Sequence, residues 1–310
     1  MSNGHGTKVR KRDGSLTPLN LDKIHKIVEE ACEGLGSGVS ASQVEMNSGL
    51  QFFDGISTKD IQEILIRSAS DLISLEAPNY QFVAARLLLY AVRKQVFGSG
   101  WTSGYPTVYD HALKCTEHDV YDQDILGKYS KEEWEQFNSW IDHERDMYFT
   151  YAGLRQVVDK YLVQDRSNGE VFETPQYMYM MIAVTLFQNY ENNRLDYIKR
   201  YYDAISKHKI NIPTPIMAGV RTPLRQFASC VLVDADDTLD SIFTSDMAIG
   251  RYVAQRAGIG INAGRIRGIN AKIRGGEVQH TGVVPFLKKF EATVRCCTQN
   301  GIRGGSATVH

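Results

Sequence analysis

Residues 227–268, FASCVLVDADDTLDSIFTSDMAIGRYVAQRAGIGINAGRIRG, decide the fold class of this chain. The short apolar run at 227–235 is typical of a buried strand. Apolar residues then recur at helical spacing over 238–256, with Asp237 as the expected N-cap and Gly258 as the expected stop. A strand followed by an amphipathic helix and a Gly/Arg loop predicts an α/β layer or barrel.

The alternation continues on both sides of this stretch. Upstream, INIPTPIMAGV at 210–220 is a second apolar run, for which we expect another buried strand. Downstream, a Gly/Arg loop at 274–277 precedes a helix from Pro285 to Cys297. A third glycine-rich loop, TQNGIRGGSAT, covers 298–308. The α/β pattern therefore extends over the last third of the chain.

The first two thirds are predicted to be mainly helical. Residues 8–19 are predicted to form a β-hairpin, because Asp13-Gly14 is a strong two-residue turn signal. Apolar spacing and capping residues predict helices from about Asn20 to Gly34, from the Ser57/Thr58 cap through Leu72, over Tyr80–Val96, over 173–190 and over 194–207.

Composition excludes several classes of protein. The chain has 310 residues, enough for two or three domains, and is 43% hydrophobic and 23% charged, as globular proteins are. Its net charge of −1 provides no basic field for a nucleic-acid backbone. The start lacks a signal-peptide pattern, and no run approaches the roughly 18 apolar residues of a membrane helix. We expect a cytoplasmic protein without direct nucleic-acid or membrane partners.

The number and spacing of the cysteines do not predict a disulfide framework. An odd count of five without regular spacing argues against a disulfide scaffold, and no CxxC or Cys/His cluster has zinc spacing, so we expect no metal site. Adjacent Cys296 and Cys297 are interpreted as structural, since neighbouring cysteines form disulfides only with strain.

Several motifs have plain structural interpretations when composition alone is considered. The KRDG turn is then a solvated basic hairpin, the helix at 238–256 packs in a core, and Cys230 is an inert core thiol. GIGINA satisfies GxGxxA, but the dinucleotide fingerprint requires a strand before it and a helix after it, so we reject that interpretation. The RGG triplets at 274–276 and 303–305 are too few for a disordered RNA-binding segment.

Residues 8–95 nevertheless resemble the ATP-cone regulatory domain of class I ribonucleotide reductase large subunits, through KRDG, LNLDKIHKI, ISTKDIQE and LLLYAVRK. The resemblance implies binding of ATP as activator or dATP as inhibitor. It assigns the nucleotide site to Lys11, Arg12, Thr17, Lys23, Thr58, Gln62 and Lys94. Thr17 and Gln62 stand where the family has an acidic residue and a histidine, so the resemblance leaves open whether dATP inhibits through this domain.

The run TPIMAGVRTPLRQFASCVLVD at 214–234 resembles the reductase barrel segment that carries one cysteine of the active-site redox pair. By that resemblance, Cys230 reduces the 2′-position of the substrate and ends in a disulfide with a partner thiol. CTQNGIRGGSAT resembles the loop that relays effector identity to the substrate base. The substrate-binding residues implied are Thr214, Ser229, Ala257, Gly258, Gln299 and Arg303.

DDTLDSI and QRAGIGINAGRIRG resemble the specificity site of the same family. The resemblance implies that Asp237, Leu239 and Arg267 bind an effector dNTP at a dimer interface. The helix at 238–256 would then pack against its copy in a homodimer.

The resemblance extends over the whole chain and implies three domains: an ATP-cone domain at 1–95, a helical domain at 96–210, and the first strands of a ten-stranded α/β barrel, left incomplete, at 211–310. The expected fold class is α/β with a mainly helical N-terminal half. The implied activity is radical reduction of ribonucleoside diphosphates to deoxyribonucleoside diphosphates, with ATP, dATP and dNTPs as effectors. This chain would bind no cofactor itself, because a separate small subunit holds the di-iron tyrosyl radical. Thioredoxin or glutaredoxin would be the reductant.

The family's Asn-x-Cys-x-Glu motif, which holds the radical cysteine, does not occur around any of the five cysteines. We therefore expect a C-terminal large-subunit chain to complete the barrel, as in a naturally split subunit. A stand-alone nucleotide-binding regulator would leave 210–310 dispensable, although the substrate-loop motifs there are well formed. A vestigial fragment would be expected to have lost Cys230, Arg267 or Arg303. The KRDG and SCVL motifs together disfavour a reductase of another class.

Overall fold

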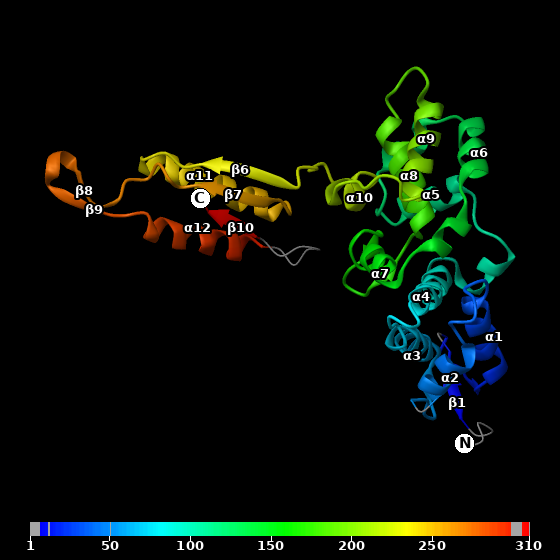
Figure 1. Ribbon diagram of the computed structural model, residues 1–310. Helices are drawn as coiled ribbons and strands as arrows, with labels where there is room; N and C mark the ends of the chain where they lie inside the picture. The colour runs from blue at the N-terminus through cyan, green and yellow to red at the C-terminus, as the bar shows by residue number, and fades with distance from the viewer. Residues whose placement is uncertain (1–6, 12, 50, 299–305, 310) are drawn as a thin grey trace. The chain divides into compact units, whose positions relative to one another are not determined.

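The chain folds into two compact units, shown in the computed structural model of Figure 1. The structure describes residues 7–11, 13–49, 51–298 and 306–309. The first unit comprises Met1–Ile212 with Val220–Pro223, and the second comprises Pro213–Gly219 with Leu224–His310. Among the described residues, no helix is long and apolar enough to span a membrane.

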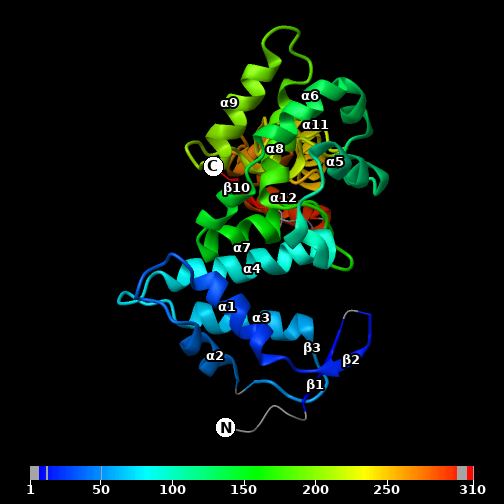
Figure 2. The same ribbon diagram turned by 90° about the vertical axis from the view of Figure 1, so that its right-hand side faces the viewer.

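A small sheet opens the first unit. Strand β1 (Lys8–Arg10) lies at its centre, antiparallel to β2 (Leu16–Pro18) and parallel to β3 (Ile56–Ser57). Figure 2 shows these strands beside α3, into which β3 leads directly. The helices of this part are α1 (Leu21–Cys32), α2 (Ala41–Gly49), α3 (Thr58–Asp71) and α4 (Tyr80–Phe97).

The predicted hairpin β1–β2 is confirmed, but its turn is wider than the two-residue turn expected. Lys11 N–H donates to the carbonyl oxygen of Ser15 at 2.8 Å, and Gly14 N–H donates to that of Lys11 at 3.0 Å. Gly14 has a φ of +84°, which glycine adopts without steric cost. The Asp13 carboxylate also accepts from the backbone N–H of Ser15 at 2.9 Å. These bonds fix the position of Lys11 at the end of β1.

Side-chain caps confirm the predicted starts of two helices. The Asn20 side chain accepts from Lys23 N–H at 2.9 Å at the start of α1. The Ser57 hydroxyl accepts from Asp60 N–H at 3.0 Å at the start of α3. Each cap satisfies an N–H that has no partner inside its helix, and such a cap contributes on the order of 1 kcal/mol.

The rest of the first unit packs around α8 (Pro175–Phe187). This helix is apolar on every face, and its residues 175–185 are buried, as expected for a central helix. The helices predicted at 173–190 and 194–207 are confirmed as α8 and α9. The other elements here are α5 (Val108–Glu117), α6 (Lys131–Trp140), α7 (Tyr151–Lys160), α9 (Arg194–Ser206), a two-stranded hairpin of β4 (Gln164–Asp165) and β5 (Glu170–Val171), and the 3₁₀ turns Gly98–Ser103, Gln123–Lys128 and His143–Tyr148.

The second unit alternates strands and helices, which confirms the predicted α/β class. Its described strands form a parallel sheet in the order β10-β7-β6 and an antiparallel pair β8–β9. Its elements are α10 (Thr214–Gly219), β6 (Cys230–Asp234), α11 (Leu239–Ala254), β7 (Gly258–Asn262), β8 (Ile269–Ile273), the 3₁₀ turn Arg274–Gly276, β9 (Val278–Thr281), α12 (Val284–Cys297) and β10 (Ala307–Val309).

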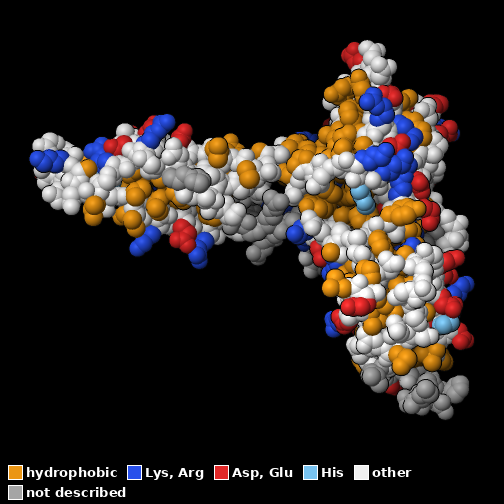
Figure 3. Space-filling model, viewed as in Figure 1, with side chains coloured by type: hydrophobic (Ala, Val, Ile, Leu, Met, Phe, Trp, Pro, Cys, Tyr) orange, Lys and Arg blue, Asp and Glu red, His pale blue; other side chains and the backbone are white. Residues whose placement is uncertain are grey.

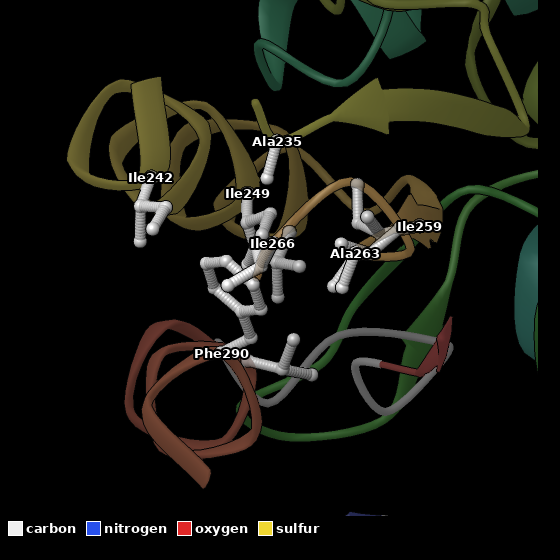
Figure 4. Packing of buried hydrophobic residues seen from close by; sticks show 10 residues of the cluster. Ala235, Ile242, Ile249, Ile259, Ala263, Ile266 and Phe290 are labelled. Carbon is white, nitrogen blue, oxygen red and sulfur yellow. The ribbon is translucent and has the colours of Figure 1, made fainter. Parts of the chain in front are cut away.

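The core of this unit lies between α11, α12 and the sheet. Figure 4 shows Phe290 of α12 pointing toward Ile249 of α11 and toward Ile266, which follows β7. Val231 and Val233 of β6 pack against this core, whereas Leu232 between them is 88% exposed. The strand predicted at 227–235 is therefore present, but only one of its faces is buried.

The prediction of a strand at 210–220 is wrong, because these residues contain the short helix α10 instead. Pro213 and Pro215 lack the N–H that a strand ladder needs, and proline suits the first turn of a helix. The carbonyl oxygen of Pro213 accepts from the N–H groups of Ile216 and Met217 at 3.0 and 3.1 Å. Pro213, which could not have donated a hydrogen bond in a strand, therefore provides the first carbonyl acceptor of α10.

Two details of the predicted helix at 238–256 are also wrong. Its N-cap is Thr238, whose hydroxyl accepts from Ser241 N–H at 3.1 Å, so the side chain of Asp237 is available for another contact. The helix ends at Ala254, and the chain turns at Arg256, which has a φ of +69°. Gly258 is the first residue of β7 and not a helix stop. These glycines lie within β7, and the next element along the chain is β8 and not a helix, so the rejection of the dinucleotide fingerprint is supported.

Candidate functional site

The first cluster of predicted site residues lies where β6 and β7 begin. Cys230 pairs with Gly258 across the two parallel strands, and Gly258 N–H donates to the carbonyl oxygen of Ser229 at 2.9 Å. A Cβ placed on Gly258 would lie 3.3 Å from the sulfur of Cys230. The thiol therefore lies directly over the backbone of Gly258, beside Ala257 and Ser229.

The third strand reaches the same end of the sheet. Ile259 N–H donates to the carbonyl oxygen of Ser306 at 3.1 Å, and the Ser306 hydroxyl lies 3.9 Å from the Cβ position of Gly258. Gln299 and Arg303, predicted to reach the substrate base, lie outside the described residues. Thr214 is the first residue of α10, in the same compact unit.

This arrangement presents a thiol that can react. Cys230 is exposed, and no disulfide links any of the five cysteines, all of which the structure describes. A thiol on a hydrogen-bonded strand is held in a defined position, which a redox reaction with a bound substrate requires. A two-electron reduction by thiols also needs a second sulfur to close a disulfide.

The second cluster lies at the start of α11. The backbone N–H of Arg267 donates to the Asp237 carboxylate at 2.9 Å, and its guanidinium donates to the other carboxylate oxygen at 2.6 Å. These bonds, with the backbone donor as the largest cause, lower the pKa of Asp237. Leu239 is the first residue of α11 and is exposed. All three predicted specificity residues therefore lie together.

A second ion pair accompanies this one. Arg265 donates to the Asp236 carboxylate at 2.8 Å, and both side chains are more than half exposed. Two guanidinium groups beside the N-terminus of a helix are a favourable environment for phosphate, because helix N–H groups and the helix dipole also favour anions. A carboxylate here accepts hydrogen bonds from hydroxyl groups. This combination suits a nucleotide.

The apolar side chains of α11 form an exposed stripe next to this cluster. Leu239, Phe243 and Met247 follow one another at four-residue spacing and are 59, 50 and 53% exposed. Figure 3 shows hydrophobic side chains at the surface of this unit. An amphipathic helix normally buries such residues, so the stripe is a candidate surface for another protein.

The third cluster, in the small N-terminal sheet, gathers the predicted ATP-cone residues. Arg10 of β1 pairs with Ser57 of β3, so Lys11 and Thr58, the next residues on each segment, lie at the same end of the sheet. Thr58 starts α3, whose N–H groups point in this direction. Arg12 lies outside the described residues.

The remaining cone residues lie on the neighbouring elements. Thr17 is on β2 opposite Val9, and Lys23 is in the first turn of α1. The Gln62 side chain donates to the carbonyl oxygen of Leu87 at 2.9 Å, which ties α3 to α4. Lys94 is exposed near the end of α4.

Sequence reasoning missed a buried ionic cluster in the first unit. Arg221 and Glu173 are fully buried and form an ion pair, with Arg221 Nε donating to Glu173 at 2.9 Å. Tyr121 also donates to Glu173, and Arg221 donates to the carbonyl oxygen of Tyr161 at 3.0 Å. Burial and the neighbouring Glu173 raise the pKa of Tyr121 well above its ordinary value. The available signal was an arginine and a glutamate inside apolar runs, which are buried only when paired.

A second buried carboxylate joins several elements. Asp146 accepts from the Gln176 side chain at 2.8 Å and lies 3.8 Å from the Arg93 guanidinium of α4. Burial raises its pKa to about 7, although Arg93 acts in the opposite direction. Among the described residues, no group of three or more His, Cys, Asp or Glu side chains is arranged to hold a metal ion.

Comparison with known families now identifies the class of protein. Three family profiles match in order along the chain: the ATP cone domain over 7–95, the ribonucleotide reductase all-alpha domain over 147–225 and the ribonucleotide reductase barrel domain over 228–310. Together they cover most of the sequence. The chain belongs to the class I ribonucleotide reductase large-subunit family, and it corresponds to an N-terminal portion of that subunit.

Individual relatives agree. Ribonucleoside-diphosphate reductase 1 subunit alpha of Escherichia coli is 53% identical over 302 residues, which are 97% of this chain and 39% of the relative. The subunit alpha of Haemophilus influenzae is 52% identical over 303 residues, with 97% and 40% covered. That of enterobacteria phage T4 is 45% identical over 302 residues, with 97% and 39% covered. The chain thus spans about two fifths of the length of these relatives.

Proposed function

We propose that this chain provides one redox thiol, part of the substrate pocket and the nucleotide-control sites of a ribonucleoside-diphosphate reductase. The complete enzyme would reduce ribonucleoside diphosphates to deoxyribonucleoside diphosphates. The observation that carries the proposal is the exposed, unbridged thiol of Cys230 at the start of β6, packed against the backbone of Gly258. It lies in the segment that matches the reductase barrel domain.

In the proposed reaction, Cys230 is one of two thiols that supply the electrons. The substrate loses its 2′-hydroxyl as water, and the two thiols lose their protons and join as a disulfide. The second thiol and the radical-bearing cysteine would come from large-subunit residues other than these 310. A small subunit with a di-iron tyrosyl radical would start the reaction, and thioredoxin or glutaredoxin would reduce the disulfide.

The substrate would lie at the shared end of β6, β7 and β10. Main-chain groups at Ser229, Ala257 and Gly258 line that end of the sheet, and Thr214 would contact the phosphate from the start of α10. We assign recognition of the base to Gln299 and Arg303. Because Gly258 has no side chain, the substrate would be able to approach Cys230 closely.

Control by nucleotides would use two separate sites. An effector dNTP would bind at Asp237, Leu239 and Arg267, where its ribose and phosphates would replace the Asp237–Arg267 bonds. Two copies of α11 would pack through the exposed stripe to form a homodimer. ATP or dATP would bind in the cone near Lys11, Arg12, Thr58 and the neighbouring residues Thr17, Lys23, Gln62 and Lys94. All of this would take place in the cytoplasm.

The decisive experiment measures CDP reduction with the small subunit and a dithiol reductant. The chain would be assayed alone and after mixing with a C-terminal large-subunit piece that carries the Asn-x-Cys-x-Glu motif. We expect activity only in the mixture, at least 100-fold lower for Cys230→Ser and unchanged for the control Cys32→Ser. If the mixture is inactive although the chain binds dNTPs, a nucleotide-binding regulator becomes the better description.

A further inference from the structure

Two adjacent thiols end helix α12. The sulfur atoms of Cys296 and Cys297 lie 3.7 Å apart, and neither residue forms a disulfide. Cys296 is exposed and Cys297 is half-buried, so the pair lies at the surface of the second unit. The proposed catalysis does not use either residue, so this inference is independent of the proposed function.

The pair is held on a packed helix. Phe290 and Val294 of α12 are buried in the core of the second unit, one or two turns before the two thiols. On α11, a Cβ placed on Gly250 would lie only 3.2 Å from the sulfur of Cys297 and 3.3 Å from the Thr293 methyl group. Glycine at this position therefore leaves room for the Cys297 sulfur between the two helices.

Hydrogen bonds also fix the direction of the first thiol. The Cys296 sulfur donates to the carbonyl oxygen of Thr293 at 3.4 Å, within its own helix. The Thr293 hydroxyl in turn donates to Asp246 of α11 at 2.6 Å. The hydrogen bond to Cys296 is the largest cause that raises the pKa of Cys297. This contact therefore favours the protonated form of the Cys297 thiol.

The distance between the two sulfur atoms determines which kind of bond can link them. A disulfide needs sulfurs about 2.05 Å apart, and neighbouring residues in a helix reach that only with distortion. A soft atom bonded to both sulfurs at about 2.3 Å would subtend an angle of roughly 107° across 3.7 Å, close to tetrahedral. A single bridging atom therefore fits the pair as it stands.

We propose that Cys296 and Cys297 form a dithiol site for trivalent arsenicals. An organic arsenoxide would form two arsenic–sulfur bonds, one to each cysteine. The arsenic–oxygen double bond breaks, and its oxygen leaves as water with the two thiol protons. No atom changes its oxidation state, so the reaction needs no oxidant or reductant.

The test uses the whole 310-residue chain and phenylarsine oxide, followed by intact-mass spectrometry. We expect one phenylarsenic group per chain, which persists in excess monothiol and is removed by 2,3-dimercaptopropanol. Cys296→Ser and Cys297→Ser should each weaken retention at least tenfold in monothiol competition. Cys32→Ser and Cys230→Ser are the matched controls and should retain the group. Thermal unfolding of each variant checks that the fold is intact.

Three outcomes would overturn the proposal. Undiminished retention by Cys296→Ser or Cys297→Ser would place the adduct on other thiols. Loss of retention in Cys230→Ser would place it at the sheet end. A purified wild-type chain that lacks two hydrogen masses and binds the arsenical only after reduction would show that the pair exists as a disulfide.

Discussion

At the scale of single residues, the absence of a side chain at Gly258 leaves the space beside the Cys230 sulfur unoccupied by this residue. The Cβ of an alanine would lie 3.3 Å from the Cys230 sulfur and 3.6 Å from the Ser229 carbonyl oxygen, which is backbone and cannot turn away. At Gly260 the Cβ would instead meet the end of the exposed Leu232 side chain, which can rotate aside. The two glycines of one strand therefore have different roles.

This difference predicts the reactivity of the thiol. Gly258→Ala should slow the reaction of Cys230 with an aromatic disulfide reagent several-fold, because the methyl group covers one side of the sulfur. Gly260→Ala, on the same strand, should leave the rate unchanged. The measurement follows the release of the aromatic thiol in a Cys32→Ser/Cys296→Ser/Cys297→Ser background. Equal rates for both variants would mean that Gly258 does not control access to the sulfur.

The Asp237–Arg267 pair predicts a second residue-scale result, which rests on the proposed function. Asp237→Asn should weaken dNTP binding roughly tenfold or more, since a charge-assisted hydrogen bond contributes about 1.5–3 kcal/mol. Asp236→Asn, which removes the neighbouring and more exposed pair with Arg265, is the matched control and should change affinity by less than about twofold. Titration calorimetry with dTTP measures both. If Asp236→Asn weakens dTTP binding more than Asp237→Asn does, the effector binds beside Asp236 and not at Arg267.

At the scale of elements, Asp146 joins α4, the 3₁₀ turn His143–Tyr148 and α8 in one buried contact. Its folded-state pKa of about 7 lies above the value of about 3.9 for an unfolded chain. Between about pH 4 and pH 7 the folded state therefore keeps a proton that the unfolded state has lost. The stability that Asp146 contributes is present below pH 4 and is lost as the pH rises through 7.

Asp146→Asn should consequently gain stability relative to wild type as the pH rises, by a few kcal/mol between pH 5 and pH 8. Burial lowers the pKa of His111 and of His143 to about 3, so these groups give the opposite slope, but they cancel in the difference between the two proteins. Urea unfolding at four pH values measures the difference, with the exposed Asp159→Asn as control. A difference that does not change with pH would mean that Asp146 is ionised in the folded protein.

The elements also show what sequence patterns can predict. Helices with a capping residue and apolar spacing, such as those that start after Asn20 and Ser57, were predicted to within a residue or two, because their signals are local. The segment at 210–220 was not, because its apolar run does not distinguish a buried strand from a short helix. The hairpin at 164–171 was missed because its strands have only two residues each.

The candidate sites likewise depend on contacts that local sequence patterns do not predict. That Cys230 lies against Gly258, and Asp237 against Arg267, depends on strand register and on a contact between residues 30 positions apart. Neither follows from spacing in the sequence, and only the resemblance to known reductases brought these residues into one site. The buried pair of Glu173 and Arg221 had no such guide, since the two residues are 48 positions apart and the resemblance assigned no role to either.

At the scale of the whole molecule, the exposed stripe on α11 predicts self-association. Phe243→Glu should lower the dimer association constant at least tenfold in sedimentation experiments with an effector dNTP, because a carboxylate would lose its hydration in the interface. Tyr148→Glu replaces a residue that is also largely exposed, but in the first unit, and should have no effect. Dimers of unchanged stability for both variants would show that another surface is used.

The four residues Val220–Pro223 fold with the first unit, whereas the chain on both sides of them belongs to the second. The buried Arg221 fixes them there through Glu173. The polypeptide therefore crosses between the units three times within a dozen residues, and no single cut can separate it into two intact halves. A gene fragment that begins after this crossing lacks α10, and one that ends before it leaves Glu173 buried without a counter-charge. Dissection of this protein, by protease or by cloning, therefore has to keep residues 213–224 connected on both sides.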